Sequence, residues 1–121
     1  MPIAVLLIAH GSRRREANDD LVRLAAALRA TGQYPIVETA YLEVTQPDIP
    51  KGAQRSVEQG ATEVRLLPYF LSAGSHVVDD LERHRQELQA LHPGVIFELC
   101  PPLGLHPLMI EIVLDRLTQY D

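Results

Sequence analysis

Four short apolar runs alternate with four patterns of helical period, and this alternation restricts the chain to few folds. The runs are IAVLLIA at 3–9, IVETAYL at 36–42, VRLLPYFL at 64–71 and VIFELC at 95–100. The first run is apolar throughout, as expected of a strand that is buried on both faces. Strands that alternate with helices form a parallel sheet, joined by right-handed crossovers and covered by helices on both faces. We therefore predict an α/β fold with a four-stranded parallel sheet, built from four β-α repeats.

Each apolar run is followed by apolar residues that are spaced for one face of a helix. The four stripes are Ala17, Leu21, Leu24, Ala25 and Leu28; Ile49, Ala53 and Val57; Val77, Leu81, Leu88 and Leu91; and Met109, Ile110, Val113, Leu114 and Leu117. Gly32 and Gly60 follow the first two stripes and Pro107 precedes the last, as at helix ends and starts. Pro68 is unusual within the third run, because proline prefers edge strands or bulges. With no repeat or linker in the sequence, we expect one domain over 1–121.

The composition argues against several classes of function. The 121 residues carry a formal net charge of −5, which is unfavourable for a nucleic-acid-binding protein. The single cysteine, Cys100, excludes a disulfide framework, a zinc–thiolate knuckle or an iron–sulfur motif within one chain and fits a reducing compartment. The first apolar run is too short to span a membrane and lacks the basic start of a signal peptide. We expect a cytoplasmic protein with neither membrane nor nucleic acid as a partner.

Polar residues gather where the apolar runs end, which is where open parallel sheets bind ligands. The residues concerned are His10, Gly11, Ser12, Arg13, Arg14 and Arg15 after the first run, Glu43 after the second, Ser72, Gly74, Ser75 and His76 after the third, and His106 after the fourth. Neutral imidazole is a common ligand of iron, cobalt, nickel and zinc. A nearby carboxylate can complete the coordination or accept a proton. The sequence therefore predicts a metal site at this rim.

The same residues also have purely structural interpretations. His10 fits a strand-end histidine that bonds to the backbone, His76 fits a first-turn helix residue, and His106 fits the N-cap of the last helix. Glu43 alone is typical of a solvated loop, and the arginines of an exposed helix face. Three arginines at a helix N-terminus oppose the helix dipole, however, and this favours an anionic ligand beside them. The residues alone leave both interpretations open.

Four stretches of the chain match a known family in the right order: LLIAHGSRRREAN, ETAYLEVTQPDIP, VRLLPYFLSAGSHVVDDL and CPPLGLHPLM. The chain resembles the CbiX/SirB-type sirohydrochlorin chelatases, the small class II chelatases of tetrapyrrole biosynthesis. The resemblance implies insertion of a divalent metal into sirohydrochlorin without ATP; cobalt leads toward cobalamin and iron toward sirohaem, and nickel is a third candidate. It also implies that His10 and His76 handle the metal and that Glu43 is the acidic residue of the site.

The resemblance has further implications for substrate contacts and assembly. Sirohydrochlorin carries many carboxylates, which gives Arg13 and Arg14 a role as anion partners. The other expected substrate contacts flank the two metal histidines or lie in the last element: Gly11, Ser12, Ser72, Gly74, Ser75 and His106. Longer members contain two such domains, and this chain resembles the short form that works as a homodimer. The metal is a substrate, and no tightly bound cofactor is expected.

Other functions are compatible with parts of this pattern. A non-catalytic carrier of metal or tetrapyrrole would need the same rim residues. His10-Gly11 followed by arginine is similar to the Arg-His-Gly core of histidine phosphatases, but Ala9 stands in place of the required arginine. A receiver-type signalling domain needs an acidic cluster after the first strand, and Ile8-Ala9-His10-Gly11 provides none.

Overall fold

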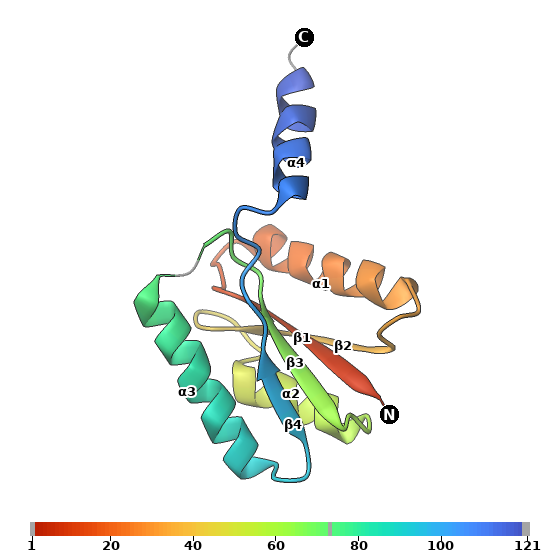
Figure 1. Ribbon diagram of the computed structural model, residues 1–121, viewed down its shortest axis with the longest axis vertical. Coiled ribbons are helices and arrows are strands. Elements are labelled where there is room, and N and C mark those ends of the chain that lie inside the picture. Colours follow the sequence, from red (N-terminus) through yellow and green to blue (C-terminus); the bar gives the residue numbers. More distant parts are fainter. Residues whose placement is uncertain (1, 73, 120–121) are drawn as a thin grey trace.

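The computed structural model describes residues 2–72 and 74–119 and confirms the four β-α repeats (Figure 1). Its elements are β1 (Ile3–Ala9), α1 (Arg15–Ala30), β2 (Ile36–Tyr41), α2 (Ile49–Glu58), β3 (Glu63–Pro68), α3 (Ser75–Leu91), β4 (Ile96–Leu99) and α4 (Pro107–Thr118). The strands form one parallel sheet in the order β2-β1-β3-β4. The carboxyl ends of all four strands therefore point to the same end of the sheet.

The central strands follow the predicted runs closely, with one difference at β3. β1 has five consecutive buried residues, as its uninterrupted apolar run predicts. β3 ends at Pro68, three residues before the predicted end of the run at Leu71. Proline has no N–H for the sheet, so it occupies the last position of this interior strand. Beyond it, the Tyr69 N–H donates to the Ile8 carbonyl at 2.7 Å, and the chain then leaves the sheet.

Three helices bury the two faces of the sheet. One face packs against α2 and α3, in a core that includes Leu6, Leu66 and Phe97. The other face packs against α1 over β1 and β2. α2 approaches the sheet closely at Gly52, where a Cβ atom would lie 2.8 Å from Leu6 Cδ1. This packing fixes the strand ends on which the candidate site is built.

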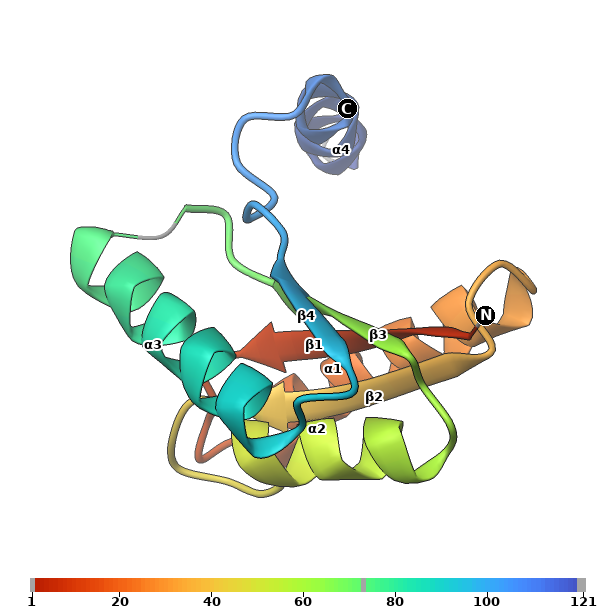
Figure 2. The ribbon, with the colours of Figure 1, turned by 60° about the horizontal axis from the view of Figure 1, so that its bottom comes forward.

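α4 forms where the sequence predicts a helix, but it covers neither face of its own sheet. None of its described residues is buried, and Figures 1 and 2 both show it apart from the sheet and the other helices. The Leu103 N–H donates to the Phe70 carbonyl at 3.0 Å, and Pro101-Pro102 stiffens the segment before it, so the chain is led away from the sheet. The predicted stripe on α4 thus does not face the core. None of the described helices, α4 included, is long and apolar enough to cross a membrane.

The start of α2 depends on one side chain. Asp48 is the N-cap, and its Oδ1 accepts from the Lys51 N–H at 3.0 Å. We expect Asp48→Ala to lower the free energy of unfolding by about 1 kcal/mol, because an N–H in the first turn loses its partner. Asp48→Asn keeps the acceptor and is expected to unfold at the wild-type urea concentration. Equal losses in the two variants would show that the acceptor oxygen of residue 48 is not the source of the stabilisation.

Candidate functional site

Backbone hydrogen bonds join the loops at the carboxyl ends of the strands. The Glu43 N–H donates to the His10 carbonyl at 3.1 Å, which ties the segment after β2 to the segment after β1. The Leu103–Phe70 bond does the same for the segments after β4 and β3. The predicted gathering of these segments at one rim of the sheet is thus present in the structure, and His10 and Glu43 are neighbours along the backbone pairing.

The imidazole of His10 lies on an aromatic platform. Its ring is stacked on Phe70, with centroids 4.2 Å apart and 22° between the planes. Phe70 is 6% exposed and belongs to the core under α2 and α3, whereas His10 is exposed. One face of the imidazole is therefore fixed by a rigid apolar ring, and the remaining edges are open to a ligand. Sequence reasoning placed Phe70 within a strand and missed this role; an aromatic residue just beyond a strand end beside the rim was the available signal.

Gly11 allows the loop after β1 to touch the loop after β2. Its φ is +98°, and a Cβ atom there would lie 2.0 Å from the backbone oxygen of Glu43. No side chain fits this position. The observed requirement for glycine thus comes from the neighbouring backbone, while a contact between Gly11 and a substrate stays a prediction.

The other predicted metal residues lie on the same rim without forming a closed metal site. Glu43 is exposed, and His76 is exposed in the first turn of α3, which follows the N-cap Gly74. Ser72 and Ser75 are also exposed. Within residues 2–72 and 74–119, no group of three or more His, Cys, Asp or Glu side chains is placed to hold a metal ion. The metal roles of His10, His76 and Glu43 therefore stay predictions.

The three arginines lie at the start of α1, where two hydrogen bonds between Ser12 and Asn18 fix the turn that leads into the helix. Arg14 is the N-cap position and makes no side-chain cap bond. Instead, the Ser12 N–H donates to Asn18 Oδ1 at 2.9 Å, and Asn18 Nδ2 donates to the Ser12 carbonyl at 2.8 Å. The side chains of Arg13, Arg14 and Arg15 take no part in these hydrogen bonds and are exposed. Asn18 was not singled out from the sequence, which carries no signal that separates it from other polar residues of the helix.

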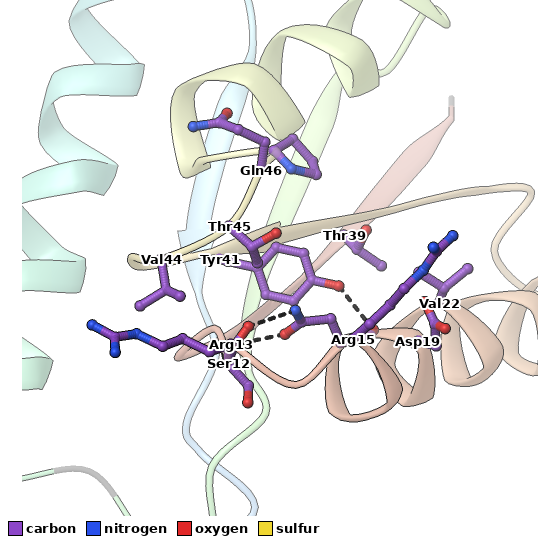
Figure 3. Close-up of a pocket in the computed structure, with 12 residues that line it drawn as sticks. Ser12, Arg13, Arg15, Asp19, Val22, Thr39, Tyr41, Val44, Thr45 and Gln46 are labelled. Atoms are coloured by element: carbon purple, nitrogen blue, oxygen red, sulfur yellow. Dashed lines mark hydrogen bonds between the residues drawn. The ribbon is translucent and has the colours of Figure 1, made fainter.

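A cavity of about 540 Å³ lies between the start of α1, the end of β2 and the loop that follows it (Figure 3). Its lining is mostly polar and consists of Ser12, Arg13, Arg15, Asn18, Asp19, Val22, Thr39, Tyr41, Val44, Thr45, Gln46 and Pro47. The Tyr41 hydroxyl donates to the Asn18 carbonyl at 2.9 Å, and burial, followed by the charge of Asp19, raises the pKa of Tyr41. His10, Glu43 and His76 are not among the lining residues. Arg13 and Arg15 therefore line a cavity that is separate from the three predicted metal residues.

His106 has the structural role that the sequence allowed for it. It is the N-cap of α4, and its Nδ1 accepts from the Leu108 N–H at 3.1 Å. Because Nδ1 is the acceptor, the proton of the neutral ring is on Nε2, where it can be donated to a ligand. Elsewhere on the rim, burial is the largest cause that raises the pKa of the Cys100 thiol.

Comparison with known proteins decides the family. The sequence profile named CbiX matches residues 4–120. The chain belongs to the CbiX family. It is 34% identical over 113 residues to a chloroplastic sirohydrochlorin ferrochelatase of Arabidopsis thaliana, a match that covers 93% of this chain and 50% of the relative. It is also 34% identical over 113 residues to a sirohydrochlorin cobaltochelatase of Priestia megaterium, over 93% of this chain and 37% of the relative.

A solved relative has the same fold. The chain superposes on the sirohydrochlorin chelatase SirB of Bacillus subtilis subspecies spizizenii, solved in complex with cobalt, with a TM-score of 0.90 and 25% identity. The match covers 98% of this chain and 51% of SirB. This member of the CbiX family thus spans about half the length of SirB and at most about half that of the two curated relatives.

Proposed function

We propose that this CbiX-family chain inserts divalent cobalt or iron into sirohydrochlorin, with nickel as a third candidate metal. The observation that carries the proposal is the arrangement of two residues at the rim of the sheet. The Glu43 N–H donates to the His10 carbonyl, and the exposed imidazole of His10 is stacked on Phe70. Relatives named for iron and for cobalt match this chain at the same 34% identity. The choice between the two metals therefore rests on supply as much as on ligand type.

The proposed chemistry exchanges two protons for one metal ion. His10 and His76 hold the divalent ion at the rim, above the macrocycle. As the ion moves, its bonds to imidazole break, bonds to the ring nitrogens form, and two pyrrole N–H protons leave. Glu43 and the released imidazoles accept these protons. Imidazole suits both tasks, because it binds these metals as a neutral ligand and takes up protons near neutral pH.

The proposed substrate contacts follow from charge and position. Arg13 and Arg14 are exposed beside the rim and attract the carboxylates of the macrocycle. The Nε2–H of His106 offers a further donor. The proposal also includes a homodimer and a reducing compartment such as the cytoplasm, where a lone cysteine stays a thiol.

Loss of either metal histidine tests the proposal most directly. Purified protein is incubated anaerobically with sirohydrochlorin and Co²⁺, Fe²⁺ or Ni²⁺ in turn, and metal insertion is followed by absorbance. We expect His10→Ala and His76→Ala each to lower the initial rate by roughly 100-fold, in the range of removing a residue that acts directly in the reaction. Glu43→Gln is expected to lower kcat with little change in KM for the metal.

The matched control is His84→Ala, because His84 lies on α3 away from the N-terminal turn and is 20% exposed. It should retain the wild-type rate. Near-wild-type rates in both His10→Ala and His76→Ala, with unchanged circular dichroism, would contradict the assignment. Stoichiometric binding of sirohydrochlorin with no turnover by the wild-type protein would instead identify a carrier.

A further inference from the structure

Val44 has a backbone conformation that valine adopts only at a cost. Its φ is +76°, and in the part of the chain that the structure describes it is the one non-glycine residue with a positive φ. The Thr45 N–H donates to the Glu43 carbonyl at 2.9 Å, so residues 43–45 form a γ-turn centred on Val44. A γ-turn with positive φ is rare and strained, and a β-branched residue adds to the strain. The loop after β2 therefore carries a local backbone cost at Val44.

The path of this loop requires the turn but not the valine. The Glu43 N–H is bonded to the His10 carbonyl, and the Tyr41 N–H donates to the Pro47 carbonyl at 2.9 Å. The chain must therefore reverse its direction within the few residues between these two bonds. Glycine would adopt the same φ without the steric cost of a Cβ atom. The hydrogen bonds of the loop thus account for the turn, and they do not account for the valine side chain.

Packing within the chain does not offset the cost of the turn. Val44 is 60% exposed and belongs to neither hydrophobic core, whereas Leu42, two residues earlier, packs against the core under α2 and α3. Strained residues cluster at active sites and ligand clamps, where the strain is part of the function. An exposed apolar side chain in a strained turn therefore points to a contact with a molecule outside the chain.

The position of Val44 indicates which molecule this is. Val44 follows Glu43 directly in the chain, and together with Arg13 it lines the polar cavity of about 540 Å³ (Figure 3). The proposed substrate has N–H protons at its centre, an apolar ring around them and carboxylates at its edge. Glu43, Val44 and Arg13 offer a proton acceptor, an apolar surface and a cation. The three side chains thus match the substrate from its centre to its edge.

We infer that Val44 is a substrate-contact residue, whose methyl groups pack against the apolar ring of sirohydrochlorin between the metal site and the carboxylates. This inference rests on the proposed function and adds an apolar contact to its charged ones. The contact removes apolar surface of both partners from water, and this favours binding. It transfers neither a proton nor the metal. Val44 therefore acts on the affinity for the macrocycle, and the insertion step itself depends on other residues.

The test is the dissociation constant of metal-free sirohydrochlorin, measured by anaerobic absorbance titration. Val44→Gly and Val44→Ala both remove the two methyl groups, and each should raise this constant roughly three- to tenfold. Val44→Leu keeps an apolar side chain and should stay within about twofold of the wild type. In the insertion assay, Val44→Ala should raise KM for sirohydrochlorin by the same factor, with little change in kcat.

Urea unfolding separates the side chain from the backbone. Val44→Gly should raise the midpoint by roughly 0.5 M, because glycine is not strained at the observed φ. Val44→Ala keeps a Cβ atom and should gain less. A midpoint that falls in Val44→Gly would show that the chain itself holds the valine, and the inference would be wrong. Weaker binding in Val44→Gly alone, with Val44→Ala unchanged, would also overturn it, because the cause would then be a looser backbone.

Leu91→Ala is the matched control for loss of an exposed apolar side chain. Leu91 is 68% exposed and is the last residue of α3, at the opposite end of this helix from His76. It should leave the dissociation constant unchanged. Wild-type affinity in both Val44→Gly and Val44→Ala would overturn the contact and leave the chelatase proposal standing. Failure of the chelatase proposal is a different result, in which the wild-type chain binds sirohydrochlorin and inserts no metal.

Discussion

Gly11→Ala is expected to destabilise the protein by about 3 kcal/mol or more and to abolish metal insertion. An alanine at the observed φ of +98° is strained by about 1–2 kcal/mol. Its Cβ would also meet the Glu43 backbone oxygen at 2.0 Å, so the loop after β2 must move away. That movement breaks the bond from the Glu43 N–H to the His10 carbonyl and separates two residues of the proposed site. The free energy of unfolding in urea and the initial insertion rate are the measurements.

Gly60→Ala isolates the contribution of the backbone angle. Gly60 also has φ +98°, but a Cβ atom there would have no neighbour within 4 Å. It follows the C-cap of α2 and precedes the start of β3, at the opposite end of the sheet from the rim. This variant should lose only about 1–2 kcal/mol, from the positive φ, and retain full activity. Equal destabilisation by the two substitutions would show that the contact between Gly11 and Glu43 does not constrain the rim.

The strands were well predicted from the sequence, because a strand that is buried on both faces consists of consecutive apolar residues. IAVLLIA contains no polar residue, and the structure makes it β1 with its bounds unchanged. The rim followed from topology, since parallel strands bring their carboxyl ends together whatever the loops contain. His106 as an N-cap was also predictable, because the residue before Pro107 is a natural helix start.

Two features of the molecule could not be predicted from the pattern. Helical periodicity identifies an apolar surface on α4 but not where that surface packs, and the expected packing of α4 on the sheet is absent from the described residues. The platform under His10 depends on where the chain goes after Pro68 ends β3. That path follows from bonds between residues far apart in sequence, such as Leu103 to Phe70, which periodicity does not encode.

Phe70→Leu should weaken metal binding while the protein stays folded. Leucine fills much of the buried space of a side chain that is 6% exposed, but it removes the ring on which the His10 imidazole is stacked. Aromatic pairs of this kind contribute about 0.5–1.5 kcal/mol, so we expect Co²⁺ affinity to fall roughly three- to tenfold. Phe70→Ala should do the same and also lower the free energy of unfolding by about 3–4 kcal/mol, because it leaves a cavity. Calorimetric titration with Co²⁺ and urea unfolding measure the two effects.

Phe97→Leu separates loss of the platform from loss of core packing. Phe97 is 1% exposed in the same core as Phe70, and its ring lies 5.8 Å from that of His92, which ends α3 at the opposite end from His76. The substitution should cost as much stability as Phe70→Leu and leave Co²⁺ affinity unchanged. In a His10→Ala background, Phe70→Leu should no longer alter Co²⁺ affinity, because the ring that it supports is gone. A persistent loss in that background would mean that Phe70 acts on the rim without His10, and the platform would not be the means by which the fold presents the metal ligand.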